Sequence, residues 1–327
     1  MSSAAPPPVL AVSDLTVVFE TDRGALRATD GVSLDLQQGR TLCLVGESGC
    51  GKSVTALAIM RLLPRSAEVL GGRVELHGRD LLALTERELR GVRGREISMI
   101  FQEPLSALNP VITVGAQVSE VIRAHQGLSR KAARRKAVEV LEMVGLPAAA
   151  ERYHAHPHEL SGGMRQRIMI AAALACGPAI LIADEPTTAL DVTIQAQILD
   201  LLCRLQQDLG MATLLITHDL GIVAETADDV VVMYAGQVVE RAPSESLFAS
   251  PCHPYTQALL RSLPRPDRGG DGRLWAIPGS VPELTTIPQG CRFADRCEHV
   301  FAPCRREDPE LRKCAEGRFA RCHLVEA

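Results

Sequence analysis

The chain has 327 residues, of which 46% are hydrophobic and 3% aromatic, and its formal net charge is −4. This size predicts one large globular domain with an appendage. The weak negative charge and few aromatic residues argue against a nucleic-acid surface built on phosphate contacts and base stacking. The longest apolar run, residues 168–176, falls well short of the roughly 18 residues of a spanning helix. No export signal is visible at the start, so we expect a cytoplasmic protein.

Apolar residues alternate over residues 10–19 and around 32–36, which predicts an antiparallel edge sheet. Further along, continuous apolar runs indicate strands that are buried on both faces. These runs cover residues 41–45, 97–101, 180–183 and 213–217. Helical stretches separate the runs, so they predict a parallel sheet in an α/β core. Residues 109–178 are rich in helical sequence, and we expect them to form an inserted helical subdomain.

A glycine-rich loop lies between the run 41–45 and a helix predicted over residues 54–63. It reads Gly46-Glu47-Ser48-Gly49-Cys50-Gly51-Lys52-Ser53. Glycines let backbone N–H groups wrap a phosphate chain, and the following helix points its positive end at the same anion. Lys52 can reach the β- and γ-phosphates, while Ser53 supplies a hydroxyl for Mg²⁺. A glycine-rich turn without a ligand is disfavoured, because strand, loop and helix all fall where the mechanism requires them.

Two carboxylates, Asp184 and Glu185, end the apolar run 180–183. Ligands of such sheets bind at the carboxyl ends of the strands. Asp184 is suited to hold the Mg²⁺ shell through water, and Glu185 to polarise the water that attacks the γ-phosphate.

Ser161-Gly162-Gly163 opens another predicted helix, residues 165–175, with Ser161 as its N-cap. The two glycines allow an anion to approach the first N–H groups. The motif alone is also compatible with a simple helix cap. Its separation from the first loop favours a phosphate contact to a nucleotide that another chain binds.

Together these motifs resemble an ATP-binding-cassette (ABC) nucleotide-binding subunit, which implies a P-loop NTPase core of α/β class. Gln102 resembles the loop glutamine that touches Mg²⁺ and senses a transmembrane partner. His218 resembles the switch histidine at the γ-phosphate, and Phe19 matches the aromatic that stacks on adenine. Ala189-Leu190-Asp191 resembles the loop that crosses the dimer interface. Met164 departs from the general signature, which has Gln there, but the Ser-Gly-Gly core is intact.

The resemblance implies three sets of site residues. The catalytic residues are expected to be Glu185, His218 and Lys52. The residues expected to bind Mg²⁺ are Ser53, Gln102 and Asp184. ATP contacts are expected from Phe19, Gly46, Glu47, Ser48, Gly49, Cys50, Gly51, Lys52, Ser53, Val54 and Gln102, and in trans from Ser161, Gly162, Gly163 and Asp191.

Residues 183–193, 233–236 and 253–256 are similar to the dipeptide and oligopeptide importer branch, which includes nickel importers. That branch implies a peripheral subunit on the cytoplasmic face of the cell (inner) membrane, in a head-to-tail dimer with a second ATPase subunit, preferably a paralogue. The resemblance also implies two transmembrane permease subunits and an extracytoplasmic binding protein as partners. It implies no nucleic-acid partner. Alternatives are a nickel importer ATPase, a soluble cassette ATPase acting on DNA or ribosomes, and a regulatory subunit without hydrolysis. Intact Lys52, Asp184, Glu185 and His218 speak against the last.

A composition shift near Pro264 separates a nucleotide-binding domain, residues 1–263, from a small irregular extension, residues 264–327, which begins with a linker over 264–272. We expect the basic residues of this extension to be solvated charges, or to bring it against an acidic partner; they are Arg292, Arg296, Arg305 and Arg306.

Five of the ten cysteines lie in the extension. We expect a metal site there, with Cys291, Cys297, Cys304 and Cys322 as its ligands. Four cysteines usually bind zinc, but the paired C-x-x-C knuckles are absent, and the wider spacings fit an iron–sulfur cluster, although no standard ferredoxin pattern matches. The importer resemblance favours a [4Fe–4S] cluster, with zinc or no metal as alternatives. Cys314 is left over and Cys252 is isolated.

Overall fold

The computed structural model describes residues 6–22, 24–102, 107–188, 190–263 and 276–325. It divides into two compact units. The first unit consists of Met1–Val9, Leu36–Arg40 and Ala83–Ile216, and the second of Leu10–Asp35, Thr41–Leu82 and Thr217–Ala327. The linker predicted at 264–272 and residue Ala189 lie outside the described residues.

Three parallel strands form the sheet of the first unit, in the order β8 (Ala212–Thr217), β7 (Ile180–Asp184) and β6 (Ile97–Ile100). Every residue of these strands is buried. Continuous apolar runs are needed where both faces of a sheet are covered, so the prediction of buried parallel strands is confirmed.

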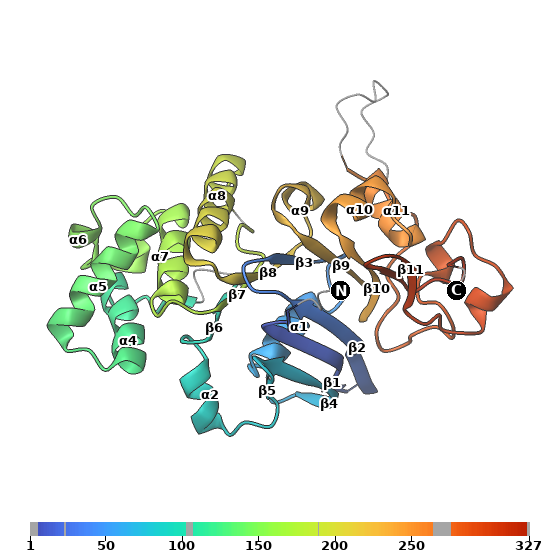
Figure 1. The fold of residues 1–327 in the computed structure, drawn as a ribbon, viewed down its shortest axis with the longest axis horizontal. Helices are drawn as coiled ribbons and strands as arrows, with labels where there is room; N and C mark the ends of the chain where they lie inside the picture. Colours follow the sequence, from blue (N-terminus) through green and yellow to red (C-terminus); the bar gives the residue numbers. More distant parts are fainter. Residues whose placement is uncertain (1–5, 23, 103–106, 189, 264–275, 326–327) are drawn as a thin grey trace. The chain divides into compact units, whose positions relative to one another are not determined.

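Helices supply the remainder of the first unit, and several pack against one another (Figure 1). They are α2 (Glu86–Val92), α4 (Val114–Gln126), α5 (Arg130–Met143), α6 (Ala149–Arg152), the 3₁₀ turn η1 (Pro157–Glu159), α7 (Gly162–Leu174) and α8 (Val192–Leu209). Helices α4 and α5 pack against each other. Val118 and Ile122 of α4 and Ala133 and Ala137 of α5 are fully buried, and the two residues of each helix are four positions apart, which places them on one face.

A four-stranded antiparallel sheet lies in the second unit. Its order is β2 (Gly24–Leu36), β1 (Leu10–Thr21), β4 (Ala67–Leu76) and β5 (Arg79–Asp80). Along β1 the burial alternates, because one face of an antiparallel strand is covered and the other is wet. The predicted antiparallel edge sheet is therefore present.

The second unit also contains a run of strands in which only the first pair is parallel. In order these are β3 (Thr41–Val45), β9 (Asp229–Tyr234), β10 (Gln237–Pro243), β12 (Arg318–Ala320) and β11 (Arg312–Ala315). The last two strands come from the extension, and β12 pairs with β10 at Glu240↔Ala320. The sequence did not indicate this docking, because short exposed strands carry little apolar pattern.

Helices α1 (Lys52–Ile59), α9 (Leu220–Thr226), α10 (Ser244–Ala249) and α11 (Pro254–Arg261) complete the second unit with two 3₁₀ turns, η2 (Ala294–Arg296) and η3 (Ala302–Arg305). The helix predicted over 54–63 is shorter than expected, since α1 ends at Ile59 and Arg61 turns to a positive φ of 49°. Pro64 would also disfavour helical backbone at the residue before it. Across the described ranges, no helix is both long and apolar enough to cross a membrane.

Candidate functional site

The glycine-rich loop joins β3 to α1 in the second unit, as the sequence predicts. Its geometry depends on Gly51, which takes a left-handed φ of 104° at the N-cap of α1. A Cβ at this position would lie 2.5 Å from the carbonyl oxygen of Ala28. No side chain fits there, so the backbone alone forms this turn.

Lys52 is folded into the loop and is only 5% exposed. Its ammonium Nζ donates to the carbonyl oxygens of Gly46, at 2.8 Å, and Glu47, at 3.0 Å. These carbonyls hold the cation where the loop closes. A phosphate chain entering the loop would compete with them for the same ammonium.

Glu47 ties the loop to the C-terminal half of the second unit. Its backbone N–H donates to the hydroxyl of Tyr255 in α11 at 3.0 Å. Its carboxylate accepts two hydrogen bonds from Arg296 of the extension, at 2.6 and 3.0 Å. Two parallel N–H···O bonds between a guanidinium and a carboxylate make a geometrically specific ion pair.

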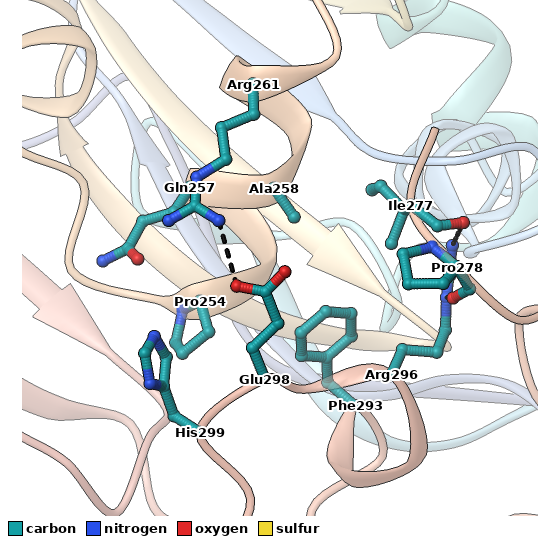
Figure 2. A pocket seen from close by; sticks show the side chains of 10 residues that line it. All are labelled: Pro254, Gln257, Ala258, Arg261, Ile277, Pro278, Phe293, Arg296, Glu298 and His299. Carbon is teal, nitrogen blue, oxygen red and sulfur yellow. Dashed lines mark hydrogen bonds and ion pairs between the residues drawn. The ribbon is translucent and has the colours of Figure 1, made fainter. Parts of the chain in front are cut away.

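Arg296 is therefore not the solvated charge that we expected. Its side chain is 5% exposed, because it also donates to the carbonyl oxygen of Pro278 and lies beside Phe293 (Figure 2). The hydrogen bond to Glu47 raises the pKa of Arg296, so the guanidinium stays charged. The contact joins residues 249 positions apart, and no local sequence signal reports it.

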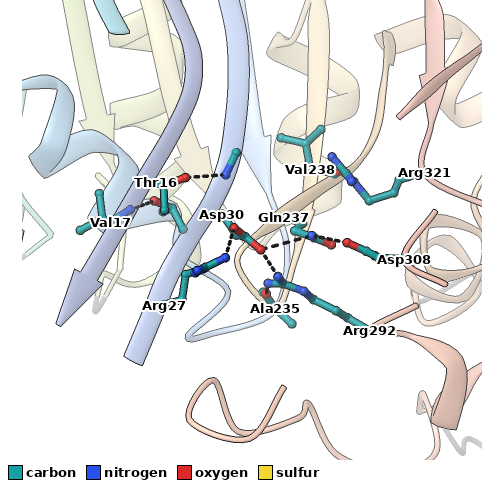
Figure 3. A network of polar contacts seen from close by, with 12 residues as sticks. Thr16, Val17, Arg27, Asp30, Ala235, Gln237, Val238, Arg292, Asp308 and Arg321 are labelled. Atoms are coloured by element: carbon teal, nitrogen blue, oxygen red, sulfur yellow. Dashed lines mark hydrogen bonds and ion pairs between the residues drawn. The ribbon is translucent and has the colours of Figure 1, made fainter. Parts of the chain in front are cut away.

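Arg292 makes a second buried ion pair, also contrary to expectation. It is 8% exposed and pairs with Asp30 of β2. It also donates to the carbonyl oxygen of Ala235 at 2.5 Å. Figure 3 shows this network, in which Gln237 bridges Asp30 and Asp308. Two buried arginines thus hold the extension against the rest of the second unit.

In the first unit, β7 ends at Asp184 and the chain turns sharply at Glu185, which has a positive φ of 45°. A non-glycine residue in this conformation is strained, and such strain clusters at functional sites. The carboxylate Oε2 of Glu185 accepts from the amide Nε2 of Gln102, at 3.1 Å, and from the hydroxyl of Thr188, at 2.9 Å. The structure brings Gln102 and Glu185 together, and it adds Thr188, which the sequence did not single out.

Ser161 caps α7, accepting from the N–H of Met164 at 3.4 Å, as the sequence predicts. Gly163 faces α8, where an added Cβ would lie 2.9 Å from a methyl group of Ile194. Asp191 caps α8 by accepting from the N–H of Ile194 at 2.9 Å. Ser161, Gly162 and Asp191 are exposed. The N-terminal end of α7 therefore lies at the surface of the unit.

The structure also places the other residues that the sequence predicts to contact the nucleotide. His218 follows β8, directly before the N-cap Asp219 of α9. Phe19 is half-buried on β1, opposite Ala67. Phe19, the glycine-rich loop and His218 belong to the second unit, whereas Gln102, Asp184, Glu185, Ser161 and Asp191 belong to the first.

Four thiols converge in the extension. Cys291, Cys297, Cys304 and Cys322 line one small hollow together with His299 and His323. The Sγ atoms of Cys297 and Cys322 accept N–H bonds from the residues two positions on, at 3.4 and 3.5 Å. Burial, together with the nearby thiols, raises the pKa of Cys291 to about 11. Among the described residues, however, no three His, Cys, Asp or Glu side chains stand close enough to hold a metal ion.

Comparison with known proteins decides the family. The chain is 52% identical over 315 residues to a probable peptide ABC transporter ATP-binding protein of Sinorhizobium fredii, covering 96% of this chain and 94% of the relative. It is 50% identical to the oligopeptide transport ATP-binding protein AppD of Bacillus subtilis, covering 97% of each. It is 49% identical to the dipeptide transport ATP-binding protein DppD of Escherichia coli, covering 96% of each. The chain belongs to the ABC transporter family.

Two family models match this ABC protein. Residues 29–188 match the ABC transporter model, and residues 239–304 match the C-terminal region of oligopeptide/dipeptide transporters. A dimeric ATP-binding cassette in a post-hydrolysis state with ADP and Pi has a similar fold, with a TM-score of 0.65 and 28% identity, covering 72% of this chain and 98% of that one. The cassette cbiO1 of Clostridium perfringens, part of an ABC transporter complex, gives 0.63 and 26%, covering 75% and 92%. The ABC protein is an ATP-hydrolysing subunit with a P-loop NTPase core.

Proposed function

We propose that this ABC protein hydrolyses ATP to ADP and phosphate to power the uptake of dipeptides and oligopeptides. The match of residues 239–304 to the peptide-transporter C-terminal region carries the proposal, since it lies outside the cassette match over 29–188. Dipeptides are the preferred solute, and nickel uptake by a related importer is the alternative. The domains are the cassette, residues 1–263, and the extension, residues 264–327.

The nucleotide roles follow the chemistry of the side chains. Lys52 and the backbone of residues 46–54 bind the phosphates, Phe19 stacks on adenine, and Ser53, Gln102 and Asp184 hold Mg²⁺. Glu185 polarises the attacking water, with His218 at the γ-phosphate. The hydrogen bonds from Gln102 and Thr188 support this role, because they orient the Glu185 carboxylate.

A second ATPase subunit, preferably a paralogue, completes the nucleotide-binding site in trans. It does so with Ser161, Gly162, Gly163 and Asp191. The exposure of Ser161, Gly162 and Asp191 supports this, as does Val192, an apolar side chain that is 82% exposed beside them. Two permease subunits sense the site through Gln102. An extracytoplasmic binding protein delivers the solute to them, and the chain sits on the cytoplasmic face of the membrane as a peripheral subunit.

The test is reconstitution of the chain with its paired ATPase, the two permease subunits and the binding protein in proteoliposomes. We expect a dipeptide to stimulate ATP hydrolysis and to accumulate inside the vesicles, and Glu185→Gln to abolish both. Stimulation by Ni²⁺ but not by peptides would replace the peptide proposal with the nickel alternative.

We also propose that Cys291, Cys297, Cys304 and Cys322 ligate a [4Fe–4S] cluster. Four thiols around one hollow are the donor set of such clusters, and N–H bonds to cysteine sulfur are a usual part of their surroundings. Burial raises the pKa of Cys291, and a bound cation would favour the thiolate that ligation requires. The sulfurs must draw together for binding. Zinc is the alternative ligand.

Anaerobic purification tests the cluster. We expect a coloured protein with about four irons per chain. Cys304→Ser should lose the iron, while Cys203→Ser, a control in α8 of the first unit, should keep it. A colourless protein with stoichiometric zinc would refute the iron–sulfur assignment.

A further inference from the structure

Two cysteines outside the four-thiol hollow meet elsewhere in the second unit. The Sγ atoms of Cys252 and Cys314 lie 2.9 Å apart, although the residues are 62 positions apart in the chain. A disulfide bond is about 2.05 Å long, so the sulfurs are within about 0.9 Å of bonding distance. From the sequence, we interpreted Cys252 as isolated and Cys314 as left over. The structure corrects both interpretations, because the two thiols lie beside each other.

Cys252 is held in place by strand β10. It lies in the turn between α10 and α11, and its N–H donates to the carboxylate Oε1 of Glu240 at 2.7 Å. The next N–H, of His253, donates to Oε2 of the same carboxylate at 2.8 Å. Glu240 is fully buried in β10. Both of its oxygens therefore clamp the backbone that carries Cys252.

Cys314 is connected to the same strand through β12. It lies on β11, where the pairing with β12 shifts between Lys313 and Ala315. Such an irregularity re-aims the side chain of the unpaired residue. Strand β12 pairs with β10, again at Glu240. The two thiols are thus brought together by two anchors on one strand, and this preorganisation lowers the entropic cost of joining them.

Arg318 of β12 donates to the Sγ of Cys252 at 2.9 Å. Burial nevertheless raises the pKa of Cys252 to about 12, assisted by the Cys314 thiol and the Glu240 carboxylate. The raised pKa means that the Cys252 thiolate is not stabilised in the reduced protein, which favours the disulfide. Both side chains are half-buried, which leaves them partly open to a small oxidant.

We propose that Cys252 and Cys314 form a redox-sensitive dithiol that closes to an intramolecular disulfide, separate from the four-thiol hollow. The oxidant is a low-molecular-weight disulfide. The thiolate of one cysteine attacks a sulfur of the oxidant and expels one thiolate, giving a mixed disulfide. The other cysteine then attacks its partner's sulfur and expels the second. The protein loses two protons and two electrons, and the oxidant leaves as two thiols.

A disulfide between Cys252 and Cys314 would link the turn before α11 covalently to the extension. Tyr255, in the first turn of α11, accepts from the N–H of Glu47 in the glycine-rich loop. The disulfide would therefore restrain the segment that contacts the glycine-rich loop.

Peptide mapping of the intact chain tests the proposal. The reduced protein is incubated with oxidised glutathione, blocked with an alkylating reagent, digested without reductant and analysed by mass spectrometry. We expect the peptides with Cys252 and Cys314 to appear as one linked species that dithiothreitol releases. Separate glutathione adducts on the two cysteines, a link from either one to a cysteine of the hollow, or two unmodified thiols would each overturn the proposal.

Variants give a second measurement. Cys314→Ser should prevent the link, and Cys203→Ser, a half-buried cysteine in the first unit, should leave it intact. Oxidation should raise the melting temperature of the parent by about 5 °C, because a long loop is closed. The same oxidation should leave Cys314→Ser unshifted. An equal shift in both proteins would overturn the assignment. Iron content, measured in parallel, reports on the four-thiol hollow independently.

Discussion

The glycine-rich loop and the C-terminal extension satisfy their polar groups in opposite ways. In the loop, the Lys52 ammonium binds the carbonyl oxygens of residues five and six positions away, Glu47 and Gly46. In the extension, Arg296 and Arg292 bind Glu47 and Asp30, which lie 249 and 262 positions away. The polar contacts of the loop therefore join residues that are close in sequence. The extension is held by distant contacts.

This difference predicts two kinds of mutational effect. Changes in the local motifs should reduce turnover and leave the fold nearly intact, because few packing contacts are lost. Changes in the arginine contacts should reduce stability first, because they leave a buried charge unpaired.

The largest effect is expected for Glu185→Gln. The carboxylate that polarises water is lost while its neighbours can still hydrogen bond, so hydrolysis should fall by about 10²–10⁴-fold. Phosphate release measures the loss, and nucleotide binding and the urea midpoint should stay near those of the parent. Unchanged hydrolysis would remove Glu185 from the proposed role.

Ser161→Ala separates a helix cap from a nucleotide contact. Both Ser161 and Ser129 cap helices of the first unit, with N–H···Oγ distances of 3.4 and 3.3 Å. Each alanine variant should cost about 1 kcal/mol of stability. Only Ser161→Ala should also lower ATP hydrolysis of the assembled dimer, by about tenfold or more. Equal activity of the two variants would reduce Ser161 to a cap.

Arg296→Met tests the extension itself. It leaves the carboxylate of Glu47 without its partner, and we expect a loss of about 2–4 kcal/mol in the free energy of unfolding, below the full value for a buried pair because Glu47 is partly exposed. Urea denaturation measures it. Adding Glu47→Gln should recover about 1–2 kcal/mol, since the unpaired charge is removed. Strict additivity of the two changes would show that the pair is not coupled.

Of the two ion-pair changes, the smaller effect is expected for Asp30→Asn. The amide oxygen can still accept from Arg292, but the negative charge is lost, so the free energy of unfolding should fall by about 1–2 kcal/mol. Asp35→Asn is the matched control on the same strand, because its partner Arg241 is more exposed, with 31% of its side chain accessible. A loss of the same size in both variants would contradict the importance of burial.

Much of the nucleotide site was predictable from the sequence. Gly51, Lys52 and Ser161 act through their own backbone or through neighbours a few positions away, so residue type and spacing carry the information. The turn at Glu185 could also be placed, because a buried strand ends there. Its hydrogen bond from Gln102 could not, since it joins two strand ends that meet only in the folded sheet.

The sequence alone therefore determined the family, the α/β core and the motifs of the phosphate machinery. Only the tertiary structure decided that Arg292 and Arg296 are buried anchors, and that Cys252 and Cys314 face each other. The physical reason is that these contacts depend on where β10, α11 and the extension dock. Charges and thiols have no periodic pattern that reports a partner 60 or more positions away.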